Sequence, residues 1–221
     1  MHSTIKNLLN IKNNIKENLN LLNINNNPKI IAVSKTFKID KIKPLIDYGH
    51  FDFGENKVQE AFLRWQERIN IYKDLELRLI GPLQSNKVKQ SLNLFDVIET
   101  IDREKIAIEI SKNFHNNVKT KSFYIQINTG NEPQKSGLDP LQADSFIKYC
   151  INDLNLPIVG LMCIPPQNEA PSLHFAFLKK IAASNSLDEL SMGMSNDYQD
   201  AIKFGSTSVR IGSLFFGKRQ V

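Results

Sequence analysis

Residues 29–35 read KIIAVSK, and this stretch decides the fold class. Its apolar residues follow one another without the alternation that marks a strand with one solvated face. Such a short continuous run is typical of a parallel strand buried on both faces. The run ends at Ser34 and Lys35, which places a lysine at the carboxyl end of the predicted strand.

The segment before this strand predicts a helix. Between residues 5 and 22, isoleucine and leucine recur at three-, four- and seven-residue spacings, and asparagine and lysine fill many of the other positions. That pattern indicates one amphipathic helix. A cluster of asparagines at residues 23–27 ends it in a turn, and Pro28 leads into the strand.

The unit of a short apolar strand followed by a helical pattern repeats along the chain. Strands are predicted at residues 29–35, 51–53, 77–80, 95–100, 122–128, 157–164, 187–192 and 209–211, and helices at 39–48, 58–71, 103–116, from 139 onwards, 172–186 and 196–203. Such alternation indicates a parallel sheet with crossover helices. Eight strands predict an α/β fold, a single (β/α)8 TIM barrel domain over residues 1–221 with an additional N-terminal helix. A doubly wound sheet is disfavoured, because residues 34–36 contain no glycine.

The composition excludes several classes of protein. A hydrophobic fraction of 41% and a charged fraction of 23% are ordinary for a globular chain and exclude collagen, a coiled coil and wholesale disorder. No apolar run approaches the roughly 18 residues of a membrane span. The 28 basic and 23 acidic residues leave a net charge of +5, and the basic residues are scattered among acidic ones. We therefore expect neither a membrane nor a nucleic acid as partner.

The cysteine and histidine patterns indicate neither a disulfide nor a metal site. Cys150 and Cys163 lack CxxC spacing, which predicts free thiols in a reducing cytoplasm. The four histidines show no metal-ligand spacing. The N-terminal segment has no uninterrupted apolar region of a secretory signal, so a cytoplasmic location is expected.

In a (β/α)8 barrel, the functional residues lie at the carboxyl ends of the strands. There, apolar walls would favour the neutral amine of Lys35, the form that attacks a carbonyl. Ser195 lies where a helix N-cap is expected, and Gly212 and Ser213 follow the last strand, so both loops offer hydrogen-bond donors to an anion. Arg210 is placed to face the barrel interior. Taken singly, these residues have simpler explanations, which are the default: a solvated lysine, an ordinary N-cap and a structural ion pair.

One ligand would use all these groups together. It carries an aldehyde for Lys35, a phosphate for the two loops and a ring acceptor for Arg210. Pyridoxal 5′-phosphate (PLP) has these groups.

Several segments also carry a family resemblance. They are residues 32–36 (AVSKT), 53–56 (FGEN), 58–60 (VQE), 80–87 (IGPLQSNK), 135–137 (KSG), 160–162 (GLM), 190–195 (LSMGMS), 205–207 (GST), 209–213 (VRIGS) and 216–217 (FG). In this order they resemble the pyridoxal phosphate homeostasis protein family (YggS/PROSC-like proteins). The resemblance covers nearly the whole chain and implies an alanine-racemase-like barrel standing alone, with PLP held as a Schiff base.

The resemblance implies a role for each predicted site residue. Lys35 matches the lysine that forms the Schiff base, and Arg210 matches the arginine that faces the pyridine nitrogen. Asn56 and Met194 match residues near the cofactor. The matching phosphate contacts are Ser195, Gly212 and Ser213.

Two positions depart from the family pattern. Residues 77–79 read LRL where the family commonly has Trp-His-Phe, and Lys57 replaces a residue that is often aromatic or apolar. Neither departure is expected to touch the lysine, the arginine or the phosphate contacts. Lys87 and Lys135 are expected in loops at the same end of the barrel, where solvation is the simplest explanation.

The residues leave three functions open. An arginine at the ring nitrogen would keep that nitrogen unprotonated and weaken carbanion chemistry, which favours a PLP-binding protein of vitamin B6 homeostasis and amino-acid balance over an enzyme. A low-activity PLP-dependent amino-acid racemase is the alternative, although no tyrosine is an obvious second acid/base and 221 residues leave no room for a second domain. A nucleic-acid-binding barrel is the third. The expected partners are PLP and apo-enzymes that require it, and the expected state is a monomer.

Overall fold

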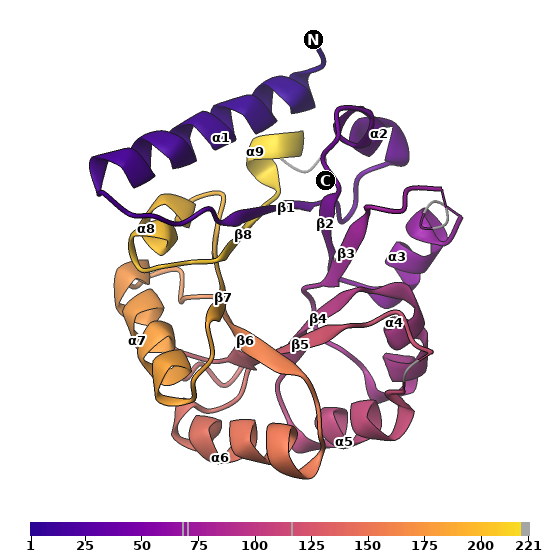
Figure 1. Ribbon diagram of the computed structural model, residues 1–221, viewed down its shortest axis with the longest axis vertical. Coiled ribbons are helices and arrows are strands. Elements are labelled where there is room, and N and C mark those ends of the chain that lie inside the picture. The colour runs from indigo at the N-terminus through magenta and orange to yellow at the C-terminus, as the bar shows by residue number, and fades with distance from the viewer. Residues whose placement is uncertain (68, 70, 116, 218–221) are drawn as a thin grey trace.

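Eight parallel strands close into a barrel in the order in which they occur in the chain (Figure 1). The structure is a computed structural model, and it describes residues 1–67, 69, 71–115 and 117–217. The strands are β1 (Lys29–Val33), β2 (Asp52–Glu55), β3 (Glu76–Leu79), β4 (Val97–Ile101), β5 (Ser122–Ile127), β6 (Ile158–Cys163), β7 (Glu189–Met194) and β8 (Ser208–Ile211). Parallel pairing of β1 with β8 closes the sheet. The predicted TIM barrel is confirmed.

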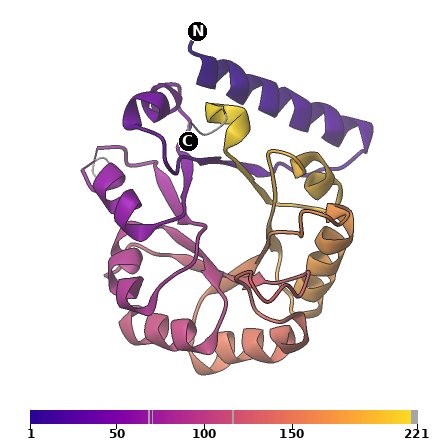
Figure 2. The same ribbon diagram turned by 180° about the vertical axis from the view of Figure 1, so that it is seen from behind.

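The helices form a ring outside the strands, as Figures 1 and 2 show from the two sides. They are α1 (Ser3–Leu21), α2 (Ile39–Asp47), α3 (Val58–Trp65), α4 (Val88–Leu94), α5 (Glu104–Asn113), α6 (Ala143–Lys148), α7 (Pro171–Ser184), α8 (Tyr198–Lys203) and α9 (Ser213–Phe216). Short turns of helix, η1 (Ser85–Lys87), η2 (Pro140–Gln142) and η3 (Tyr149–Asp153), adjoin α4 and α6. In the part of the chain that the structure describes, none of these helices combines the length and apolar character needed to cross a membrane.

The predicted N-terminal helix is confirmed as α1. Its buried side chains are Thr4, Leu8, Ile11, Ile15 and Leu19, which recur every three or four residues and so share one face. This face contacts α2, α8 and α9. The helix therefore braces the first and last elements of the barrel against each other.

Five elements differ from the predicted local structure. The segments that form α4 and α9 were not predicted as helices, and each has seven residues or fewer. Strand β7 begins and ends two residues later than predicted. The helix predicted at 58–71 ends at Trp65 and the one predicted at 103–116 ends at Asn113, while residues 68, 70 and 116 lie outside the described residues.

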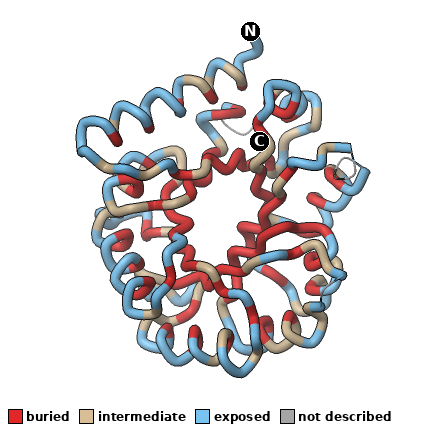
Figure 3. Tube along the Cα trace, in the orientation of Figure 1, coloured by how far each residue is buried: buried red, intermediate tan, exposed pale blue. Residues whose placement is uncertain are grey.

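The strands are buried along nearly their whole length (Figure 3). Apolar side chains make up most of this core, as parallel strands covered by helices require. Charged and polar side chains also lie in it: Glu55, Arg78, Glu99, Gln126, Ser191 and Arg210 are all buried. Buried charges need partners, so these residues mark positions where the core does more than pack.

His50 packs in this core between the barrel and its last helix. Its ring lies 5.6 Å from the ring of Phe53 and 5.8 Å from that of Phe215, and its Nε2 lies 3.1 Å from the carbonyl oxygen of Asp52. Burial lowers the pKa of His50 to about 4, an effect that Asp52 partly opposes and Lys12 reinforces.

The folded protein should lose stability as the pH falls from 6.5 to 4, because the unfolded chain then binds a proton at His50 and the folded chain does not. This difference should lower the free energy of unfolding by up to about 1.4 kcal/mol per pH unit. The free energy of unfolding is measured in urea over this pH range. In His50→Gln the pH dependence that comes from His50 should be missing, whereas His115→Gln, which changes an exposed histidine, should keep it. Equal slopes for the wild type and His50→Gln would contradict the prediction.

Candidate functional site

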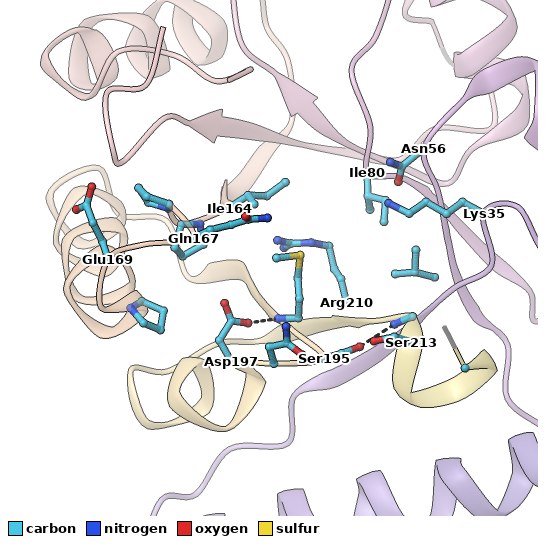
Figure 4. Close-up of a pocket in the computed structure, with 18 of the residues that line it drawn as sticks. Lys35, Asn56, Ile80, Ile164, Gln167, Glu169, Ser195, Asp197, Arg210 and Ser213 are labelled. Atoms are coloured by element: carbon cyan, nitrogen blue, oxygen red, sulfur yellow. Dashed lines mark hydrogen bonds between the residues drawn. The ribbon is translucent and has the colours of Figure 1, made fainter. Parts of the chain in front are cut away.

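The candidate site is a cavity of about 710 Å³ at the carboxyl ends of the strands (Figure 4). A volume in the range of about 300 to 1,000 Å³ suits a small organic ligand. All seven residues predicted from the sequence to bind a cofactor line it: Lys35, Asn56, Met194, Ser195, Arg210, Gly212 and Ser213. In Figure 4, Lys35 enters from one side, Gln167 and Glu169 lie on the other, and Arg210 lies between them.

Lys35 stands on a short loop that connects β1 to α2. The next residue, Thr36, has a φ of 69°, a left-handed conformation that is uncommon for a residue with a branched Cβ. Such a backbone persists only where surrounding contacts hold it. The loop around the lysine therefore needs an anchor.

Glu55, at the end of β2, is that anchor. Its Oε1 accepts hydrogen bonds from Ser34 Oγ at 2.7 Å, Arg64 NH1 at 2.7 Å and Trp65 Nε1 at 2.9 Å, and its side chain is fully buried. Arg64 Nε in turn donates to the carbonyl oxygen of Phe37 at 3.1 Å. Glu55 and Arg64 thus hold the loop on both sides of Lys35.

Asn56 follows Glu55 and is half-buried at the cavity. Its backbone lies against Gly81, where a Cβ would stand 2.2 Å from the Asn56 carbonyl oxygen. Only glycine allows this approach of the two backbones, which fixes the position of Asn56 at the end of β2.

The loop after β7 differs from the prediction. Ser195 is not a helix N-cap, because a turn over residues 195–197 intervenes and α8 begins at Tyr198. Instead, Asp197 Oδ1 accepts a hydrogen bond from the Met194 N–H at 2.5 Å, closing the turn on itself. Burial raises the pKa of Asp197, although this hydrogen bond and Arg210 oppose the rise.

Ser195 joins the loops that follow β7 and β8. Its Oγ accepts the Gly212 N–H at 3.3 Å and the Leu214 N–H at 3.5 Å. Both bonds are long, so the donors are only weakly satisfied. A hydroxyl and several backbone N–H groups from two loops are the groups that bind an anion such as a phosphate.

Arg210 reaches the cavity from β8 and is almost wholly buried, with 3% of its surface exposed. Its NH1 donates to Ser191 Oγ at 2.7 Å, and its NH2 donates to the carbonyl oxygen of Cys163 at 2.8 Å. The simpler explanation of this residue as half of a structural ion pair is therefore wrong for the described residues, since its partners there are a hydroxyl and a carbonyl.

The two loop lysines that the sequence analysis explains by solvation differ in their position relative to the cavity. Lys135 Nζ lies 3.3 Å from the carbonyl oxygen of Pro165 at the cavity rim and pairs with Glu132, whereas Lys87 is not among the lining residues.

Cys150 and Cys163 are buried free thiols, as predicted. Burial raises the pKa of the Cys163 thiol to about 12, which makes it unreactive. Among the described residues no cluster of histidine, cysteine and carboxylate groups could hold a metal ion.

Comparison with known proteins identifies the family. Residues 7–220 match the alanine racemase N-terminal domain. A pyridoxal phosphate homeostasis protein of Haemophilus influenzae is 38% identical over 93% of this chain and 96% of its own, and one of Vibrio cholerae is 40% identical over 86% and 85%. The chain belongs to the pyridoxal phosphate homeostasis protein family.

Solved structures agree with this family. PipY of Synechococcus elongatus, 30% identical over 92% of this chain and 100% of its own, superposes with a TM-score of 0.79 without PLP and 0.77 with PLP bound. An alanine racemase of Clostridium difficile is 16% identical over 95% of this chain and 58% of its own, with a TM-score of 0.67. At that identity the comparison with the racemase shows only that this chain has the same barrel fold.

Glu55→Gln should lower the free energy of unfolding by about 3 kcal/mol, because it removes one charge of a buried ion pair. Urea unfolding measures the change. Glu60→Gln offers a matched control, since Glu60 pairs with Lys57 at 2.9 Å on the surface and should cost less than about 1 kcal/mol. Equal losses for the two variants would show that Glu55 does not anchor the lysine loop.

Proposed function

We propose that this chain binds PLP in the 710 Å³ cavity and holds it as a Schiff base on Lys35. The observation that carries the proposal is the meeting, in one cavity, of a lysine amine, a two-loop set of hydroxyl and backbone N–H donors, and a buried guanidinium. These groups fit the aldehyde, the phosphate and the ring nitrogen of PLP. Support also comes from the relatives named for pyridoxal phosphate homeostasis and from PipY with PLP bound.

Lys35 would hold the aldehyde end of PLP. Its Nζ, as the neutral amine, is the group in the cavity that could condense with an aldehyde, with loss of one water molecule. The loop held by Glu55 and Arg64 orients the amine towards the cavity. Because the loop is already ordered, little conformational entropy is lost when the link forms.

The loops after β7 and β8 hold the phosphate. Ser195, Gly212 and Ser213 supply a hydroxyl and backbone N–H groups from two directions. Ser195 Oγ accepts the Gly212 and Leu214 N–H groups at 3.3 and 3.5 Å. A phosphate oxygen would accept shorter, charge-assisted hydrogen bonds from the same groups.

Arg210 would face the ring nitrogen, and Asn56 and Met194 would lie beside the ring. PLP, when bound, supplies an electron sink whose strength depends on protonation of its ring nitrogen. Arg210 has only hydrogen-bond donors and stays charged, so it cannot accept a hydrogen bond from a protonated ring nitrogen as a carboxylate would. Among the described lining residues there is also no tyrosine to act as a second acid/base. Both features favour holding PLP over turning over an amino acid.

We further propose that the chain works as one PLP-binding domain over residues 1–221, as a monomer in the cytoplasm. It would supply PLP to apo-enzymes that require it and so affect amino-acid balance. The names of the relatives support the homeostatic role, and the two free cysteines suit a reducing compartment. A low-activity amino-acid racemase is the alternative function.

The purified chain mixed with PLP should gain a visible absorbance band that borohydride bleaches, and peptide mapping should then find the label on Lys35. Lys35→Ala should lose the band, because the amine is gone. Lys57→Ala is the control, since Lys57 is exposed beside Asn56 and does not line the cavity, and it should keep the band. Ser195→Ala should keep the band but weaken PLP binding about tenfold, the effect of one hydrogen bond to a charged group.

Three results would contradict the proposal. An unchanged band in Lys35→Ala would mean that another lysine forms the link. An unchanged PLP affinity in Ser195→Ala would remove the assignment of the phosphate contacts. Turnover of any L-amino acid near about 10 per second, the usual median for enzymes, would favour the racemase.

A further inference from the structure

A row of buried polar side chains crosses the barrel interior beneath the cavity. Arg210 NH1 donates to Ser191 Oγ at 2.7 Å, and Ser191 Oγ donates to Glu99 Oε2 at 2.6 Å. Arg78 NH1 donates to the other oxygen, Glu99 Oε1, at 2.9 Å. Glu99 and Ser191 have no exposed surface, and β4 and β7, which carry them, are not neighbours in the sheet. The row is therefore built across the barrel, not along one strand pair.

The donors and acceptors in this row fix the direction of its hydrogen bonds, from Arg210 through Ser191 to Glu99. A guanidinium has no acceptor, so Ser191 Oγ must accept from Arg210. The hydroxyl has one proton, and the short contact to the Glu99 carboxylate directs that proton to Glu99. Glu99 thus determines how the Ser191 hydroxyl is oriented, and the oriented hydroxyl presents its lone pair to Arg210.

Both terminal nitrogens of Arg210 donate hydrogen bonds to groups inside the barrel. NH1 donates to Ser191 Oγ, and NH2 donates to the carbonyl oxygen of Cys163. Arg210 is also one of the residues that line the cavity, so N–H groups not taken by these two acceptors are available to a ligand there. Within the described residues Arg210 forms no ion pair with a carboxylate; Glu99 is linked to it through Ser191, and the charge of Asp197 also interacts with it. A buried cation without such a charge would be costly.

We propose that Glu99 and Ser191 are positioning residues for the cofactor ring. They aim Arg210 so that its free N–H groups meet the ring nitrogen, and they act only through Arg210. This inference rests on the proposed function, since it assumes PLP in the cavity. A donor that is already aimed needs no rearrangement when the ligand arrives, so the pair should increase the affinity for a ring that carries a nitrogen acceptor.

The test compares PLP with its deaza analogue, in which a C–H group replaces the ring nitrogen. Both ligands carry the aldehyde and the phosphate, so the ratio of their affinities isolates the contact with Arg210. It is also independent of the fraction of protein that is folded. Binding of both ligands is measured by absorbance titration for the wild type, Ser191→Ala and Glu99→Gln.

Ser208→Ala is the matched control. Ser208 lies on β8 in register with Ser191, is 1% exposed, and its hydroxyl has no hydrogen-bond partner among the described residues. The same substitution there removes a buried hydroxyl without touching the row.

The wild type should prefer PLP over the deaza analogue. Ser191→Ala and Glu99→Gln should each reduce that preference about tenfold, the effect of one hydrogen bond to a charged group, while Ser208→Ala should keep it. In an Arg210→Ala background, Ser191→Ala should change nothing further. Equal weakening of both ligands, or a loss in Ser208→Ala as large as in Ser191→Ala, would show a merely structural role and overturn the inference. If the wild type binds no PLP at all, the proposed function fails with it, whereas tight PLP binding with unchanged ratios removes only this inference.

Discussion

The pairing of β1 with β8 is the interaction on which the site depends. Lys29 is paired with Ser208 and Ala32 with Ile211, so the first and last strands end side by side. Lys35 stands just beyond one strand, and Gly212 just beyond the other. Residues from opposite ends of the chain meet in one cavity only because the sheet closes. Since all eight strands are parallel, the carboxyl end of every strand lies at this same mouth of the barrel.

The strands could be predicted from the sequence, whereas helices α4 and α9 could not. A strand buried on both faces leaves a continuous apolar run, which stands out in segments such as Lys29–Val33. By contrast, α9 has four residues, which is too short for a period of 3.6 residues to be recognised, and α4 begins after Lys87, which is not a residue that marks a helix start. The position of Ser195 before a helical pattern predicts an N-cap, but sequence position does not show the turn that Ser195 begins and that extends to residue 197, before α8.

Candidate site residues could be found because strand ends face one mouth of a barrel, whereas the partners of these residues could not. Glu55 and Arg64 lie nine positions apart, and the signal in the sequence that points to Glu55 is a charge next to Gly54 at the end of a strand. Glu99 and Ser191 are ninety-two positions apart. A charge within Val97–Ile101 indicates that something inside the barrel must face it, but which strand supplies that partner depends on the closed barrel.

The row beneath the cavity alternates in charge as far as the opposite mouth of the barrel. Lys29 pairs with Glu76 at 3.0 Å, Glu76 with Arg78, and Arg78 with Glu99, so the partly exposed charges at the mouth and the buried charges inside are each balanced by the next. Arg78 stands where the family that the sequence resembles commonly has a histidine. A histidine changes its charge near neutral pH, but an arginine does not, and the carboxylates beside Arg78 raise its pKa further despite burial. The charge beside Glu99 is therefore constant across physiological pH in this chain, so the orientation of Arg210 proposed to follow from Glu99 and Ser191 would not change with pH in that range.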